Sequence, residues 1–264
     1  MAATSSGAGW PWPFLRIAHR GMPGRAPENS LRGFMLAMTL GADMVETDVR
    51  ATADGALMLA HDDVVQGPEQ RAIQISRTTL ATLRRFALAG EPPATLSEAL
   101  DLRHHGAPLA FNLDIKTSDT ARALVRALRA AGRREGILLT GHAPGTFAAV
   151  RAAEPWVCAA LTCSAGRRTA PARALARALP MPGGLLLGRH LADTARSARV
   201  GALTLEHSLA MPETVRACQG AGLRVLVWTV DDPTHMRALR AAGVDGITTN
   251  RVDLLVALDT HRAS

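Results

Sequence analysis

Short runs rich in aliphatic and β-branched residues alternate with Ala-, Leu- and Arg-rich segments of helical period along almost the whole sequence. Eight of these runs predict strands, at residues 15–18, 44–49, 108–115, 137–140, 157–162, 200–205, 224–229 and 246–249. Helices are predicted between most of them, at 31–40, 119–131, 145–153, 171–179, 212–221 and 233–242. Strands that alternate with helices form a parallel sheet, because each helix returns the chain to the edge at which the previous strand began.

The length of the chain favours a closed sheet over an open one. A TIM (β/α)8 barrel typically takes about 250 residues as one domain, and this sequence has 264. We therefore expect an α/β fold of this kind, with an N-terminal tail over 1–13 and a single barrel domain over 14–264. Gly132, Gly222 and Gly243 precede predicted strands, where glycine ends a helix in the left-handed conformation.

One region breaks the alternation. A hairpin-like stretch over 53–63, with Asp54-Gly55 as its turn, follows the second predicted strand, and a long stretch over 64–107 follows the hairpin. In a TIM barrel the loops after the carboxyl ends of strands lie on the face that carries active sites. We therefore expect a small insertion after the second strand at that face.

Charge and composition exclude several classes of protein. The net charge of +7 comes from arginines dispersed through Ala-rich segments, and aromatic residues make up 3% of the chain, so a nucleic-acid partner is not expected. No apolar run approaches the roughly 18 residues of a membrane span, and residues 1–13 do not resemble a signal peptide. Cys158, Cys163 and Cys218 show neither metal-ligand nor redox spacing, which predicts reduced, mostly buried thiols in a soluble, cytoplasmic protein.

A few residue types are rare enough to be informative. Lys116 is the only lysine, and Asn29, Asn112 and Asn250 are the only asparagines, while arginine, alanine and glycine are abundant. We infer a coding bias that has replaced dispensable lysines and asparagines. The four that persist are candidates for positions at which chemistry or geometry resisted replacement.

Polar residues gather at the C-terminal ends of the first three predicted strands. The first strand ends at 19-HRG-21, the second carries 46-ETD-48 and the third carries 112-NLDIK-116. Residues two apart on a strand share a face, so Glu46 and Asp48 point the same way, as do the polar residues of the third strand. Charged side chains inside a barrel are costly unless they bind something.

These side chains suit the chemistry of a phosphate ester. Glu46, Asp48 and Asp114 offer the hard oxygen ligands that one divalent cation, Mg²⁺ or Ca²⁺, prefers, and the lack of cysteine or clustered histidine ligands argues against zinc. Such an ion beside Arg20 and Lys116 would neutralise and polarise a phosphate group. His19 and His61, on different loops, can then divide the proton transfers of a phosphodiesterase.

An ordered set of motifs resembles the glycerophosphodiester phosphodiesterase family from about residue 15 to about residue 256. The motifs are 17-IAHRG-21, 27-PENS-30, 46-ETD-48, 52-TADG-55, 61-HD-62, 228-WTV-230 and 243-GVDGITTN-250. The resemblance implies His19 and His61 as the acid–base pair, Glu46, Asp48 and Asp114 as metal ligands, and Arg20, Lys116 and Trp228 as substrate contacts. Glu28 is expected to support the site, and Asn29 either to support it or, like Ser30, to cap the following helix.

The sequence departs from the family pattern at several positions, none of which removes a catalytic role but which together leave the identity of the substrate open. Asp114 stands where glutamate is more frequent, 140-TGH-142 stands where a Ser-Phe pair is common, and Asn250 and Val252 replace a usual Asp and Pro. His142 follows a predicted strand, so it is the histidine outside the motifs that we expect nearest the mouth of the barrel.

We therefore expect a metal-dependent phosphodiesterase that hydrolyses glycerophosphodiesters to sn-glycerol 3-phosphate and an alcohol by His/His general acid–base catalysis. The nucleophile is either water or the substrate's own glycerol 2-hydroxyl, which would give a cyclic phosphate. A phospholipase D for lysophospholipids or sphingolipids on the same fold is the alternative, and a non-catalytic phosphoester-binding barrel fits the histidine pair less well. No sequence pattern selects the alcohol, the ion or an oligomeric state.

Overall fold

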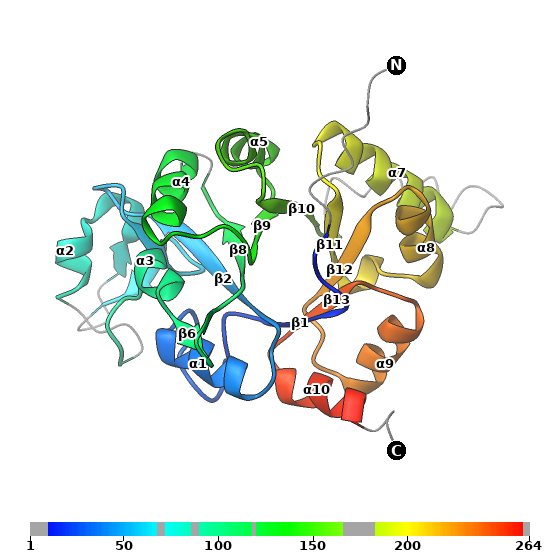
Figure 1. The fold of residues 1–264 in the computed structure, drawn as a ribbon, viewed down its shortest axis with the longest axis horizontal. Helices are drawn as coiled ribbons and strands as arrows, with labels where there is room; N and C mark the ends of the chain where they lie inside the picture. The colour runs from blue at the N-terminus through cyan, green and yellow to red at the C-terminus, as the bar shows by residue number, and fades with distance from the viewer. Residues whose placement is uncertain (1–9, 68–71, 86–89, 118–119, 166–182, 261–264) are drawn as a thin grey trace.

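Eight parallel strands close into a barrel in the computed structural model, which describes residues 10–67, 72–85, 90–117, 120–165 and 183–260 (Figure 1). The strands are β1 (Leu15–Ala18), β2 (Met44–Ala51), β8 (Phe111–Ile115), β9 (Ile137–Gly141), β10 (Cys158–Cys163), β11 (Ala202–Glu206), β12 (Arg224–Trp228) and β13 (Gly246–Thr249). Each strand pairs with the next in this order, and β1 pairs with both β2 and β13, so the sheet has no open edge. The predicted TIM barrel is confirmed.

Helices surround the barrel and cover the outer face of the sheet (Figure 1). They are α1 (Leu31–Thr39), α4 (Ala121–Ala130), α5 (Pro144–Ala153), α7 (Gly183–Ser197), α8 (Pro212–Gly220), α9 (Pro233–Ala241) and α10 (Val252–Thr260). Gly132, Gly222 and Gly243 have φ angles of 64°, 81° and 83°, so all three end helices in the predicted left-handed conformation. The helix predicted at 171–179 lies outside the described residues.

Helix α7 was not predicted, because its glycines conceal its helical period. Gly184 and Gly188 lie on the side that meets α8, and a Cβ atom at Gly188 would stand 2.5 Å from the Cβ atom of Ala217. The two glycines therefore allow the two helix backbones to approach closely, at a cost of roughly 1 kcal/mol each in helix propensity. A residue type unfavourable to the helix is needed for its packing.

The insertion after β2 begins as a hairpin, as predicted. Strand β3 (Leu57–Leu59) pairs antiparallel with β2 in the register Val49↔Leu59, and Gly55 occupies the turn with a φ of 76°. The elements that follow are β4 (Val64–Gln66), β5 (Ala72–Gln74), α2 (Leu80–Leu83), α3 (Leu96–Leu100), β6 (Arg103–His104) and β7 (Ala107–Pro108). The third barrel strand begins at Phe111 rather than at the predicted Pro108, because Pro108 pairs within the β6–β7 hairpin.

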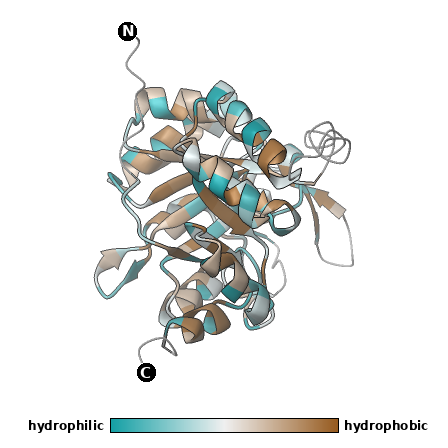
Figure 2. Cartoon of the chain, turned by 90° about the vertical axis from the view of Figure 1, so that its right-hand side faces the viewer, coloured by the Kyte–Doolittle hydropathy of each residue, from teal (hydrophilic) through white to brown (hydrophobic). Residues whose placement is uncertain are grey.

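The barrel interior is apolar at one end and polar at the other. At the end where the strands begin, an apolar layer contains Leu15, Ile17, Met44, Leu138, Ala160, Ala202 and Leu226, and Trp10 and Trp12 pack against it. The main core lies between the sheet and the helices, and the barrel strands are accordingly among the most hydrophobic parts of the chain (Figure 2). Two residues further along, most strands place a polar side chain on the same inward face. These polar side chains form the bottom of a cavity at the C-terminal end of the strands.

Two further expectations concern the whole chain. Within the part of the chain that the structure describes, no helix is long and apolar enough to cross a membrane. The three cysteines are thiols outside any disulfide, and Cys163 and Cys218 are buried. Burial raises the pKa of the Cys218 thiol to about 11.

Candidate active site

A cavity of about 210 Å³ opens at the C-terminal end of the barrel strands. It is lined by His19, Arg20, Glu46, Asp48, His61, Asn112, Asp114, Lys116, Thr140, His142, Thr162, Thr204, Trp228 and Thr248. The eight residues to which the sequence assigned catalysis, metal binding or substrate contact are all among them. Glu28 and Asn29, the two supporting residues, do not line the cavity but contact side chains that do.

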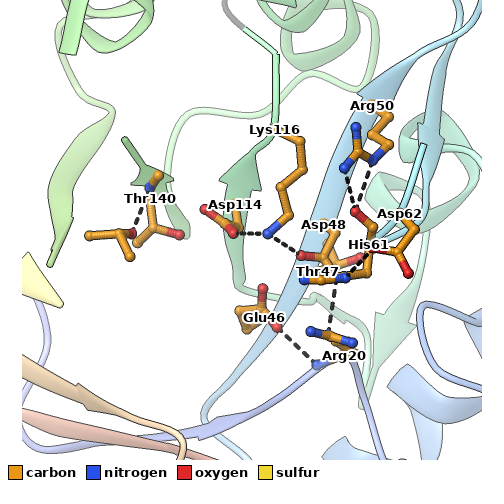
Figure 3. A network of polar contacts seen from close by, with 12 residues as sticks. Arg20, Glu46, Thr47, Asp48, Arg50, His61, Asp62, Asp114, Lys116 and Thr140 are labelled. Carbon is orange, nitrogen blue, oxygen red and sulfur yellow. Dashed lines mark hydrogen bonds and ion pairs between the residues drawn. The ribbon is translucent and has the colours of Figure 1, made fainter. Parts of the chain in front are cut away.

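Three carboxylates converge on one wall of the cavity. Asp48 on β2 is the register partner of Asp114 on β8, and one oxygen each of Glu46, Asp48 and Asp114 lie within 4.8 Å of one another. Lys116 lies between Asp48 and Asp114, with its Nζ atom 2.8 Å from Asp48 Oδ1 and in contact with Asp114 Oδ2 (Figure 3). The single lysine of the chain thus compensates part of the carboxylate charge.

The structure shows which of these carboxylates is left uncompensated. Glu46 is 6% exposed, and burial together with repulsion from Asp48 and Asp114 raises its pKa well above the usual value. Its polar partner is the backbone N–H of Arg20, which donates to Oε2 at 3.0 Å. A hard divalent cation held by all three carboxylates would relieve this repulsion, so the donor set fits Mg²⁺ or Ca²⁺.

Asp48 is held in place by the first loop. The side chain of Asn29 donates from Nδ2 to Asp48 Oδ2 at 3.0 Å, and its Oδ1 accepts from the Asp48 backbone N–H at 3.1 Å. Burial alone would raise the pKa of Asp48, but Lys116, Asn29 and Arg20 outweigh it and lower that pKa. Asn29 therefore supports the site, and Ser30 caps α1 by accepting from the Gly33 N–H.

Arg20 links the carboxylate wall to the exposed rim. Its Nε atom lies 3.2 Å from Asp48 Oδ2, and its Nη1 atom donates to Glu28 Oε2 at 2.9 Å. Glu28 thus orients Arg20 without lining the cavity itself. The guanidinium and the Lys116 ammonium face the same space, where they can contact an anionic phosphate group.

His19 belongs to a hydrogen-bond chain that fixes its tautomer. Asn250 donates from Nδ2 to Asp231 Oδ2 at 2.8 Å, and its Oδ1 lies 2.8 Å from His19 Nδ1. Because a carboxylate only accepts, the Asn250 amide must turn its oxygen toward His19, so Nδ1 carries the hydrogen. Burial lowers the pKa of His19, and the bond to Asn250 offsets this in part. Nε2, 3.9 Å from Glu46 Oε2, is therefore a free base.

We expect Asn250→Ala to lower kcat by about 10- to 100-fold, because an imidazole without this partner can rotate and change tautomer. KM should change little. Steady-state kinetics measures the loss, and ¹⁵N shifts of the His19 ring report the tautomer. Gln219→Ala is the matched control, since this amide bonds Gly243 and Asp245 where β13 begins. Full kcat with an unchanged tautomer would contradict the assigned role of Asn250.

His61 reaches the cavity from the insertion. Its backbone oxygen accepts from Nε and Nη2 of Arg50 at 2.9 and 2.6 Å, which ties it to β2. Its Nδ1 atom lies 2.9 Å from Asp62 Oδ1 (Figure 3), so Nε2 is the ring nitrogen available to a substrate. The side chain is 39% exposed, much more open than that of His19.

Several cavity residues were not singled out in the sequence. Thr162, Thr204 and Thr248 line the cavity from β10, β11 and β13, and Thr140, which the sequence marked only as a departure from the family pattern, lines it as the register partner of Asp114. Asp231 was also missed, although it binds Asn250 and Thr249 through both carboxylate oxygens. The alternation of inward and outward residues along each strand could have indicated the threonines, since each lies two residues beyond an inward residue such as Leu138 or Ala160. His142 lines the cavity, as its position after a strand suggested.

Comparison with known proteins agrees with this geometry. The profile described as the Glycerophosphoryl diester phosphodiesterase family matches residues 19–254. The chain belongs to this family. It is therefore an enzyme of the phosphodiesterase class, and the resemblance predicted from the motifs is confirmed.

Relatives in the family match over nearly their full length. A glycerophosphodiester phosphodiesterase of Caldanaerobacter subterraneus subsp. tengcongensis is 27% identical over 92% of this chain and 97% of its own. A probable glycerophosphodiester phosphodiesterase 2 of Mycobacterium tuberculosis is 29% identical over 91% of this chain and 89% of its own. An Oleispira antarctica phosphodiesterase, solved with its product sn-glycerol-3-phosphate, shares the fold with a TM-score of 0.77 at 22% identity, over 94% of this chain and 97% of that one.

Proposed function

We propose that this family member hydrolyses glycerophosphodiesters to sn-glycerol 3-phosphate and an alcohol with the help of one Mg²⁺ or Ca²⁺ ion. The observation that carries the proposal is the joint placement of His19 and His61 beside three carboxylates in one cavity. The family relationship and the sn-glycerol-3-phosphate bound to the Oleispira antarctica enzyme support the choice of substrate.

Each side chain has one task in this proposal. Glu46, Asp48 and Asp114 hold the ion, which when bound supplies positive charge to the phosphate. Arg20 and Lys116 contact the phosphate oxygens, so the negative charge that develops during attack meets fixed donors.

Two proton transfers complete the reaction. His19 Nε2 takes the proton of the attacking oxygen, and His61 Nε2 gives a proton to the alcohol oxygen as the P–O bond breaks. The attacking oxygen belongs to water or to the glycerol 2-hydroxyl. In the second case a 1,2-cyclic phosphate forms first and is then hydrolysed, with the two histidines exchanging roles.

Assays with three diesters test the proposal. Purified protein is incubated with glycerophosphocholine, glycerophosphoethanolamine and glycerophosphoglycerol, with added Mg²⁺ or Ca²⁺ and with EDTA, and the product is coupled to sn-glycerol 3-phosphate dehydrogenase. We expect turnover that EDTA abolishes. Cyclic phosphate in early quenched samples would identify the 2-hydroxyl as the nucleophile.

Two other outcomes would redirect the assignment. Choline release from lysophosphatidylcholine without turnover of glycerophosphocholine would indicate a phospholipase D on the same fold. Absence of turnover with every substrate, in folded and metal-loaded protein, would leave a phosphoester-binding role.

A further inference from the structure

The cavity has two chemically different halves. The charged half comes from β1, β2, β8 and the hairpin, and contains the carboxylates, Arg20, Lys116 and the two histidines assigned to catalysis. The other half comes from β9 to β13 and contributes Thr140, His142, Thr162, Thr204, Trp228 and Thr248, with no carboxylate, lysine or arginine among these lining residues. Since the reacting phosphate belongs to the charged half, the neutral half faces an uncharged part of the substrate.

Hydrogen bonding divides the four threonines into two pairs. The Thr140 hydroxyl donates to Asn112 Oδ1 at 2.7 Å, and the Thr162 hydroxyl accepts from the Gly141 N–H at 2.9 Å. Thr204 is 4% exposed and Thr248 is 2% exposed. Neither of these two hydroxyls bonds to another residue in the part of the chain that the structure describes. Both side chains line the cavity, so their hydroxyls are open to a ligand there and have no protein partner to give up when they bind it.

Trp228 lies between these two threonines in the sheet. It ends β12, whose neighbours β11 and β13 carry Thr204 and Thr248. Its indole Nε1–H donates to the backbone oxygen of Thr204 at 3.3 Å, which uses the only donor of this side chain. The ring therefore offers apolar surface to the cavity, and Thr204 and Thr248 line the same cavity from the two neighbouring strands, Thr204 two residues before Glu206, the register partner of Trp228. A short polyol matches this wall, because its C–H groups pack on a ring while its hydroxyls bond beside it.

The opposite side of the site has room for the leaving alcohol. A second cavity of about 340 Å³ is formed by segments 27–30, 59–66 and 91–94, and His61 lines both this cavity and the first. A proton given by His61 goes to the oxygen of the leaving alcohol, so that alcohol lies on the His61 side of the phosphate. The glycerol part must then extend toward the neutral half.

We propose that Thr204 and Thr248 hydrogen-bond the glycerol hydroxyls of the substrate, with Trp228 against its carbon chain, and thereby select a glycerol ester over other phosphate esters. The inference rests on the proposed function and adds its substrate orientation. Thr204 and Thr248 are specificity-determining residues, because they bind the glycerol hydroxyls and take no part in proton transfer.

Binding of two matched ligands tests the proposal without any turnover. sn-Glycerol 3-phosphate and n-propyl phosphate have the same phosphate and carbon chain and differ in two hydroxyls. In calorimetric titrations with Mg²⁺ or Ca²⁺ present, we expect the wild type to bind the glycerol ester at least about 10-fold more tightly. Thr204→Val and Thr248→Val should each reduce this ratio about 3- to 10-fold, and the double variant should bring it near one.

Valine has the shape of threonine, so these variants should fold. Because neither hydroxyl bonds to another residue of the described chain, its removal should leave Tm nearly unchanged. Thr214→Val is the matched control. The Thr214 hydroxyl on α8 donates to the Gly184 oxygen at 3.1 Å, and Thr214 does not line the cavity. We expect it to lower Tm and leave the affinity ratio as in the wild type.

Two results would overturn the inference: a wild-type ratio near one, or a double variant that keeps the wild-type ratio. Turnover of the diesters tests the proposed function separately. Selective binding of sn-glycerol 3-phosphate without any turnover would contradict the catalytic proposal and keep the threonine wall. Turnover of glycerophosphocholine by the wild type, with an unchanged affinity ratio in the double variant, would support the catalytic proposal and contradict the role of the two threonines.

Discussion

His61→Ala is expected to lower kcat for glycerophosphocholine by about 100- to 10,000-fold. Choline leaves as a strongly basic alkoxide unless a proton arrives as the P–O bond breaks, and His61 is placed to supply it from the hairpin. A p-nitrophenyl ester of sn-glycerol 3-phosphate has a far more acidic leaving group that needs no proton. We therefore expect the same variant to retain most of the wild-type kcat with that ester.

The comparison of the two substrates distinguishes an acid from a merely structural residue. His19→Ala should impair both substrates alike, because activation of the nucleophile is needed whatever group leaves. His104→Ala, in the β6–β7 hairpin that precedes β8, is the matched control and should affect neither. Equal losses of kcat with both esters in His61→Ala would refute its role as the acid. If His19→Ala instead kept its kcat with the p-nitrophenyl ester, His19 would be the acid and His61 the base.

Glu46→Gln is expected to change stability and metal binding in opposite directions. The amide keeps the shape of the side chain and an oxygen that accepts from the Arg20 N–H, but it removes a buried charge beside Asp48 and Asp114. In EDTA we therefore expect a higher Tm than the wild type, by about 2–4 °C for each kcal/mol of relieved repulsion. Calorimetric titration should show Mg²⁺ or Ca²⁺ binding at least about 10-fold weaker, and turnover should be lost.

The rise in Tm together with the loss of metal affinity distinguishes a metal ligand from a structural carboxylate. A structural carboxylate would stabilise the metal-free protein, so its removal would lower Tm. Glu213→Gln is the matched control, because Glu213 forms a surface pair with Arg216 on α8 and its loss should change neither quantity. Unchanged metal affinity in Glu46→Gln would exclude Glu46 as a ligand.

The fold could be predicted because the same pattern, a short apolar strand followed by an amphipathic helix, repeats along the chain. Strand positions agreed closely, since a buried parallel strand needs a short apolar run. The exceptions have local causes: Pro108 belongs to β7, a two-residue strand of the β6–β7 hairpin, and α7 uses glycines for close contact with α8. Contacts between helices depend on the tertiary fold, so they leave no periodic signal in the sequence.

The charged half of the site could be predicted for a different reason. The structure places Lys116, Asn112, Asn29 and Asn250 at the site, which are the only lysine and the only asparagines of the chain. Composition therefore marked positions where one residue type was indispensable. Threonine is not rare here, so Thr204 and Thr248 carried no such mark. Asp231 was missed because its contact with Asn250 forms only when the loop after β12 folds against the end of β13.

The β2–β3 hairpin separates three of the residues to which chemistry is assigned from the chain that follows them. Glu46, Asp48 and His61 lie on one continuous segment, and Arg50 fastens its end to β2. The chain from Val64 onward pairs β4 with β5, and Ile75 and Leu83 pack with Met58 and Ala60 in a small cluster of their own. The β4–β5 pair can therefore vary among relatives, and change the entrance to the site, while the positions of Glu46, Asp48 and His61 relative to one another stay the same.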